Sequence, residues 1–219
     1  MSSQENQVLS LEDHFDQSDL SDKEDAENLD LSPFRIDWLD LGFVGCSQSL
    51  GICALPGCRY KNTWRSLLHD IQCLKRAGVE DVFCLCTRGE FHLYRCPDLL
   101  QKYSEHGITV HHYPVNDGQV PPVEDLMKTI EDLRISLLTG KKTIVHCFGG
   151  LGRSCVVTAC TMMAMDDALR PEDVCKKLRD LRGDGAIQSV KQYNLINEFR
   201  EILNRYHSDR SADDRSVSR

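Results

Sequence analysis

The sequence predicts an α/β protein with a mainly parallel central sheet and helices on both of its faces. Short apolar segments typical of buried strands alternate along the chain with longer segments whose apolar residues recur at helical spacing. Parallel strands need long crossover connections, usually helices, so this alternation favours a parallel sheet. The 219 residues, 41% of them hydrophobic, are enough for one domain with a sizeable core.

The first half of the chain contains one predicted helix and two predicted strands. The helix covers 62–78, with Asn62 as its N-cap and Gly78 as its stop. Its apolar face consists of Trp64, Leu67, Leu68, Ile71 and Leu74. The strands follow at 79–86 and 107–115.

The second half contains a strand and four helices. A helix over 121–140, opened by Pro122, precedes a strand over 141–147 and a buried helix over 153–165. A further helix at 170–183 begins on Pro171. The last helix, 189–206, is expected to place one apolar stripe against the core: Val190, Tyr193, Ile196, Phe199, Leu203 and Tyr206.

Two polar tails flank the predicted domain of residues 33–206. Residues 1–32 are crowded with acids against one base, Lys23, and residues 207–219 are also polar, so we predict that both tails are disordered. The acidic tail either increases solubility or is an interaction or phosphorylation segment, and the sequence does not decide between these two roles.

Charge and cysteine content exclude several classes of protein. A net charge of −8 argues against general binding to nucleic acid or to a membrane surface, since both are anionic. Without a secretory signal or a long apolar segment, we expect a cytoplasmic, perinuclear or nuclear protein that is not secreted. The eleven cysteines are odd in number, which favours free thiols. Only one residue separates Cys84 from Cys86, so no metal site is expected.

The segment VHCFGGLGRS, residues 145–154, joins a predicted strand to a predicted helix. In an open α/β sheet this junction is where ligands bind. Three glycines let the backbone curl so that amide N–H groups converge, a suitable nest for a tetrahedral anion. Arg153 adds a planar fork of donors. The predicted phosphate-binding residues are Phe148, Gly149, Gly150, Leu151, Gly152 and Arg153.

Cys147 is the candidate nucleophile of this loop. Helix N-termini and cations can lower the pKa of a cysteine thiol to about 3.5–7.5, which favours the thiolate. The hydroxyl of Ser154 could then donate to the sulfur when it leaves. A buried structural cysteine is the plain alternative, a nucleotide loop lacks its Gly-Lys-Ser/Thr ending, and a thiol redox enzyme lacks Cys-x-x-Cys.

The string HCFGGLGRS resembles the signature His-Cys-x-x-Gly-x-x-Arg-Ser of cysteine-based protein phosphatases. Residues 32–206 resemble, within that family, the dual-specificity phosphatases that associate with cyclin-dependent kinases. The segments that carry this are GICALPGC, FCLCTRGE, HHYPVNDG, HCFGGLGRSC and LRDLRGDGAIQSVKQYN. The resemblance implies the dual-specificity phosphatase fold, no cofactor, and hydrolysis of phosphothreonine, phosphoserine and phosphotyrosine through a phosphocysteine. It also implies phosphorylated cyclin-dependent kinases as protein substrates, dephosphorylated on the activation-loop threonine, and hence a role in the cell cycle.

The resemblance also implies a general acid on another loop. Asp117, in YPVNDGQVPP, lies thirty residues before Cys147 and is our candidate, although Asn-Asp-Gly is also ordinary turn chemistry. Asp98 and Asp125 are weaker rivals, because apolar residues at helical spacing follow each of them. Gln188 and Gln192 resemble glutamines that position the hydrolytic water, and surface glutamines are an equally good interpretation.

Further predictions concern regulation and partners. Cys86 is a candidate resolving thiol for an oxidised Cys147, and His146 is expected to be structural. The enzyme is expected to be a monomer that docks its kinase through the polar face of the last helix: Lys191, Asn194, Asn197, Glu198, Glu201 and Arg205. The alternative is a phosphoprotein-binding adaptor with little turnover; such proteins generally lose Cys147, Arg153 or Asp117, and all three are present here.

Overall fold

The computed structural model describes residues 29–217, and the side chains of residues 29–211. Its main sheet has five strands in the order β1-β2-β7-β5-β6. Their bounds are β1 Ile36–Asp40, β2 Ser49–Cys53, β5 Asp81–Cys84, β6 Thr109–His112 and β7 Thr143–His146. The four strands from β2 to β6 are parallel neighbours, and β1 pairs antiparallel with β2. The predicted mainly parallel sheet is confirmed, with β1 and β2 added to the predicted strands.

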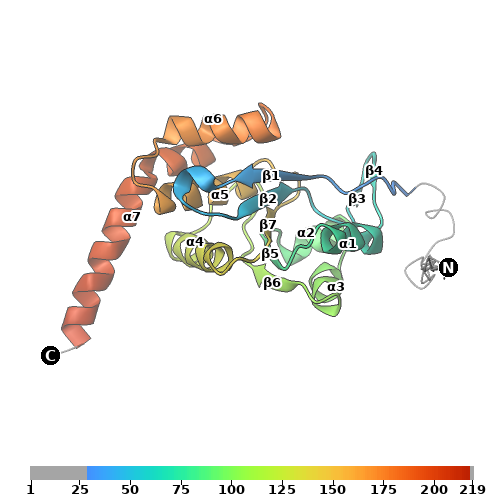
Figure 1. Cartoon of the computed structure of the whole chain (residues 1–219), viewed down its shortest axis with the longest axis horizontal. Helices are drawn as coiled ribbons and strands as arrows, with labels where there is room; N and C mark the ends of the chain where they lie inside the picture. Colours follow the sequence, from blue (N-terminus) through green and yellow to red (C-terminus); the bar gives the residue numbers. More distant parts are fainter. Residues whose placement is uncertain (1–28, 218–219) are drawn as a thin grey trace, which may run out of the picture.

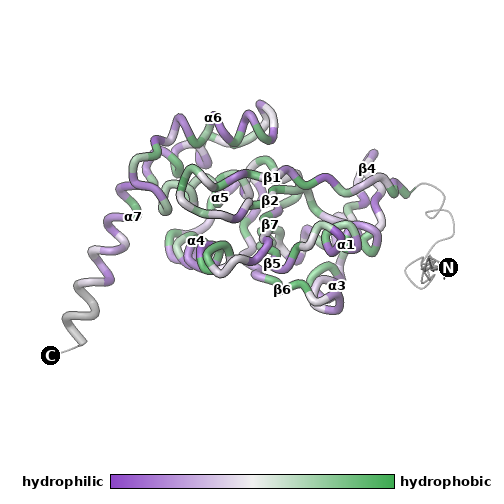
Figure 2. Tube along the Cα trace, in the orientation of Figure 1, coloured by the Kyte–Doolittle hydropathy of each residue, from purple (hydrophilic) through white to green (hydrophobic). Residues whose placement is uncertain are grey.

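Helices cover both faces of this sheet (Figure 1). On one face lie α1 (Leu67–Arg76), α2 (Arg88–Leu93) and α3 (Leu99–Glu105); on the other lie α4 (Val123–Leu138), α5 (Arg153–Met165), α6 (Pro171–Arg182) and the start of α7 (Val190–Val217). Figure 2 shows the apolar strands at the centre of the molecule.

Each central strand supplies alternate side chains to the two cores. Val82 and Cys84 of β5 pack in the cluster with α1, α2 and α3, whereas Phe83 and Leu85 pack in the cluster with α4 to α7. A strand buried on both faces reads as a continuous apolar run, which is why the sequence indicates β5 and β7 clearly.

Helix α1 starts later than the sequence predicts. Its N-cap is Ser66, whose hydroxyl accepts the His69 N–H at 3.3 Å, and not Asn62. The residues before it form a hairpin of β3 (Arg59–Tyr60) and β4 (Thr63–Trp64). Lys61 at its tip has a φ of 51°, and the Trp64 indole donates to the Lys61 carbonyl at 2.8 Å. Turn geometry therefore replaces the predicted first helical turn.

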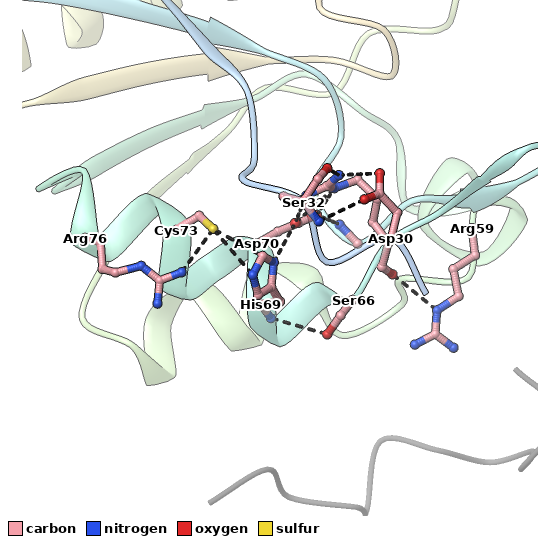
Figure 3. A network of polar contacts seen from close by, with 10 residues as sticks. Asp30, Ser32, Arg59, Ser66, His69, Asp70, Cys73 and Arg76 are labelled. Atoms are coloured by element: carbon pink, nitrogen blue, oxygen red, sulfur yellow. Dashed lines mark hydrogen bonds and ion pairs between the residues drawn. The ribbon is translucent and has the colours of Figure 1, made fainter. Parts of the chain in front are cut away.

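The first described residues are bound to α1 through a buried ion pair (Figure 3). Arg65 forms a bidentate pair with the fully buried Asp70, with a shortest distance of 2.8 Å, and also binds Asp30 at 2.9 Å. Its third contact is the Ser32 carbonyl at 2.6 Å. Asp30 and Ser32, which lie in the predicted tail, are thus in contact with the domain; residues 1–28 of that tail lie outside the described part.

Helix α7 differs from the prediction at both ends. Its buried face carries Gln192, Leu195, Ile196 and Phe199, whereas Val190 and Tyr193 are 76% and 44% exposed. The apolar period was predicted correctly, but in the first turn Val190 and Tyr193 face solvent, and the buried Gln192 occupies the inward position. The predicted tail 207–219 is helical as far as Val217, since no glycine or proline interrupts it.

Candidate active site

The loop of residues 147–152, called here the Cys147 loop, follows β7 and ends at α5, as predicted. Cys147 is 2% exposed. Gly150 has a φ of +67°, and a Cβ there would lie 2.3 Å from the Cys53 carbonyl oxygen. Both conformation and space therefore require glycine at the position that matches the phosphatase signature.

Arg153 is buried at the N-terminus of α5 and connects several elements. Its guanidinium binds both carboxylate oxygens of Glu90, at 2.8 and 2.7 Å, and donates to the Val115 carbonyl at 2.8 Å. It also lies 3.1 Å from Asp117 Oδ1. Burial disfavours the charged form, but Glu90 and the negative charge of a Cys147 thiolate raise the pKa of Arg153. The guanidinium is thus cationic, and its fork is held in one orientation.

Glu90 is a site residue that sequence reasoning missed. Its carboxylate accepts the Thr87 N–H at 2.8 Å, while the Thr87 hydroxyl accepts the Glu90 N–H. Burial opposes its charge, but the hydrogen bonds from Arg153 and Thr87 hold the pKa of Glu90 below its ordinary value. The sequence signal that could have revealed it is the Thr-x-x-Glu pattern of a capping box, which places Glu90 in the first turn of a helix shortly after β5.

The loop of residues 113–122, the Asp117 loop, is held by Ser189, the residue before α7, and by the first turn of α7. Ser189 Oγ donates to the Gly118 carbonyl at 3.1 Å, and Lys191 Nζ donates to Gln119 Oε1 at 2.8 Å. Gln192 Nε2 reaches the Gln119 carbonyl at 3.5 Å. The Asp117 carboxylate is 66% exposed and is brought to Arg153 by a loop that is held at both ends. The rival residues lie elsewhere, Asp98 at the N-cap of α3 and Asp125 in the first turn of α4.

The two predicted glutamines meet at the Cys147 loop. A Cβ on Gly152 would lie 2.8 Å from Gln188 Oε1 and 2.9 Å from Gln192 Nε2. Gln192 is buried and its Oε1 accepts the Gln188 N–H at 2.9 Å, whereas Gln188 is exposed. The structure therefore places both amides beside the loop, and Gln192 is not a surface residue.

Ser154 and His146 flank the loop in the buried interior. The Ser154 hydroxyl has no hydrogen-bond partner among the described residues, so the predicted donation to the Cys147 sulfur as it leaves stays a prediction. The imidazole Nε2 of His146 lies 3.1 Å from the Tyr103 hydroxyl. This contact agrees with a structural role for His146.

Comparison with known proteins identifies the family of this chain. A family model described as cyclin-dependent kinase inhibitor 3 matches residues 10–175. The chain belongs to this family. It is 46% identical over 205 residues to the human cyclin-dependent kinase inhibitor 3, covering 94% of this chain and 95% of that protein, and 47% identical over 201 residues to the rat protein, covering 92% and 94%.

The solved structures agree with this assignment. Kinase associated phosphatase, crystallised with its catalytic site cysteine replaced by serine, matches with a TM-score of 0.78 and 46% identity. The match covers 80% of this chain and 98% of that chain. This member of the cyclin-dependent kinase inhibitor 3 family is therefore an enzyme, a dual-specificity protein phosphatase with the fold that the resemblance implies.

An aromatic wall borders the Cys147 loop of this phosphatase. The Phe148 ring stacks on Tyr94 with ring centroids 4.2 Å apart, and Tyr60 of the β3–β4 hairpin meets both rings edge-on. Burial, together with the charges of Glu90 and Asp117, raises the pKa of Tyr94 to about 12. Phe148 is itself part of the loop, and its ring joins the loop to this aromatic wall.

In the described part of the chain, no group of histidines, cysteines or carboxylates could hold a metal ion. No helix among the described residues is long and apolar enough to span a membrane. All eleven cysteines are free thiols.

The predicted redox partner of Cys147, Cys86, follows strand β5. Cys84 pairs with His146 across β5 and β7, so Cys86 lies just beyond the strand end, beside the Cys147 loop. A hydrogen bond with Cys84 and burial raise the pKa of the Cys86 thiol. We still predict a Cys86–Cys147 disulfide after mild peroxide, because the thiolate of such a loop oxidises readily. Mass spectrometry of the wild type and of Cys86→Ser checks this; recovery of Cys147 only as sulfinic acid contradicts it.

Proposed function

We propose that this phosphatase hydrolyses phosphothreonine, phosphoserine and phosphotyrosine in protein substrates through a phosphocysteine at Cys147. The observation that carries the proposal is the position of Arg153. It begins the helix after the Cys147 loop, is oriented by Glu90, and holds the carboxylate of Asp117 at 3.1 Å. A nucleophile, a phosphate ligand and a proton donor are thereby gathered in one place.

The first step transfers the phosphoryl group to sulfur. The Cys147 thiolate attacks phosphorus, the ester P–O bond breaks, and Asp117 gives its proton to the leaving oxygen. The entering phosphate competes with Asp117 for Arg153. Once the phosphate has displaced it from Arg153, the Asp117 carboxyl group is free to face the leaving oxygen.

The second step releases phosphate. Water attacks phosphorus, the S–P bond breaks, and the Asp117 carboxylate takes the proton from the water. The amides of Gln188 and Gln192, both next to Gly152, are suited to orient that water. The hydroxyl of Ser154 is buried without a partner among the described residues, so it is free to donate to the sulfur as it leaves.

We propose that the physiological substrate is the activation-loop phosphothreonine of a cyclin-dependent kinase, so that the enzyme regulates the cell cycle from the cytoplasm, the perinuclear region or the nucleus as a monomer. The names of the close relatives support a kinase of this class. A loop that binds only the phosphate makes the same contacts with every phosphoester, so selectivity must come from contact with the protein elsewhere.

The outward face of α7 is suited to that contact. Val190 and Tyr193 are exposed apolar residues beside the polar residues Asn194, Asn197 and Glu198. The face begins two residues after Gln188, so it lies close to the site. Lys191 is bound to Gln119, so its replacement would disturb the Asp117 loop as well.

The docking prediction is therefore tested away from Lys191. We expect Tyr193→Ala together with Glu198→Lys to raise KM for an intact phosphorylated kinase about tenfold, and to leave kcat/KM for an aryl phosphate unchanged. Glu105→Lys on α3, an exposed charge reversal outside α7, is the matched control. If the enzyme cleaves an activation-loop phosphopeptide as efficiently as the intact kinase, remote docking is wrong. If the wild type binds the kinase without turnover, the alternative function, a phosphoprotein-binding adaptor, is favoured.

A further inference from the structure

A second arginine, Arg182, lies outside the phosphatase signature and forms hydrogen bonds with the backbone of the Cys147 loop. Arg182 is the last residue of α6, and its side chain is 9% exposed. Its Nε donates to the Gly150 carbonyl and its second terminal nitrogen to the Gly149 carbonyl, each at 3.0 Å. The remaining terminal nitrogen binds the carboxylate of Asp37 on β1.

These two carbonyls determine where two amide N–H groups point. In a trans peptide the C=O and the following N–H point in opposite directions, and no cis peptide occurs in the described residues. The Gly149 carbonyl shares its peptide with the N–H of Gly150, and the Gly150 carbonyl shares its peptide with the N–H of Leu151. Carbonyls held outward by Arg182 therefore turn both N–H groups toward the side opposite Arg182.

The charge of Arg182 adds to this orientation. A hydrogen bond from a cation polarises the peptide group that accepts it, which makes the N–H of the same peptide a better donor. Asp37 holds the guanidinium in place and is itself bound by Arg35 at 2.9 Å. Gly150 fits between the Cys53 carbonyl and Arg182, where a Cβ would lie 2.7 Å from the guanidinium.

We propose that Arg182 is a positioning residue for phosphate binding, which holds the N–H groups of Gly150 and Leu151 toward the bound phosphoryl group and strengthens them as donors. Arg182 acts through the loop backbone, so it is distinct from Arg153. The proposal rests on the proposed function of the Cys147 loop.

The test compares Arg182→Met, Arg182→Lys and the control Arg179→Met, an exposed arginine one turn earlier on α6. The probe is orthovanadate, measured as its inhibition constant against an aryl phosphate, with kcat and KM in parallel. An inhibition constant does not depend on the fraction of active enzyme, so partial unfolding alone would leave it unchanged.

We expect Arg182→Met to raise the orthovanadate constant about tenfold, the effect of weakening hydrogen bonds to a charged ligand. Arg182→Lys keeps the positive charge but loses the planar guanidinium, so we expect its orthovanadate inhibition constant to lie between those of the wild type and Arg182→Met. Orthovanadate inhibition constants of both variants within twofold of that of Arg179→Met would overturn the proposal. If Arg182→Met does not fold, the inhibition constant of Arg182→Lys decides alone. If the wild type neither binds orthovanadate nor turns over, the proposed function fails instead.

Discussion

Replacement of Cys147 by serine is expected to abolish turnover and to preserve binding of the phosphorylated substrate. The serine hydroxyl has nearly the same shape as the thiol but is not ionised at neutral pH, so the first step lacks its nucleophile. The anion-binding groups, namely the loop amides and the Glu90-bound Arg153, are untouched. We expect kcat to fall by at least about 10³, as for other enzymes that lose a nucleophile.

The measurement pairs steady-state turnover with capture of a phosphorylated kinase by the inactive protein. Cys73→Ser on α1 is the matched control, because it makes the same chemical change at a half-buried thiol outside the site. Residual activity within tenfold of the wild type would contradict a covalent intermediate on Cys147.

The second large effect is expected from Asp117→Asn. Asparagine keeps the size of the side chain but cannot give or take the proton, so kcat should fall by about 10²–10⁴, the usual contribution of general acid–base catalysis. The loss should be smaller for an aryl phosphate whose phenolate leaves without protonation. The leaving-group dependence is the sharper measurement, because it reports directly on the proton that Asp117 gives to the leaving oxygen.

Asp125→Asn, an exposed carboxylate in the first turn of α4, is the control for this variant. An Asp117→Asn enzyme with the pH profile of the wild type, and with an equal loss for good and poor leaving groups, would remove Asp117 from the mechanism.

Local signals in the sequence were enough to predict the strand, loop and helix around Cys147. Strand β7 is a short apolar run, the glycines mark the loop, and α5 begins at Arg153, as predicted. The strands β1 and β2 were not predicted, because β2 gains its place by pairing with β7, which is far along the chain. A pairing of that kind leaves little trace within a short window of sequence.

The partners of the site residues could not be predicted for the same reason, because their contacts join residues that are far apart in the sequence. Asp117 was predicted from its distance along the chain to Cys147, whereas Glu90 and Arg182 are recognised only from their contacts with Arg153 and with the loop carbonyls. Each contact joins residues from separate elements. In the first turn of α7, periodicity indicated the helix but not which face is inward, because the buried Gln192 is polar.

The first turn of α7 also limits how this enzyme could be re-engineered. Ser189, Lys191 and Gln192 fasten the Asp117 loop, while Tyr193, the next residue, faces outward. Two surfaces with different tasks are thus interleaved on a single helical turn. A chimaera that receives the outward face of another phosphatase would have to keep residues 189, 191 and 192 of this chain. Grafts that begin at residue 193 would exchange the outer surface without loosening the Asp117 loop.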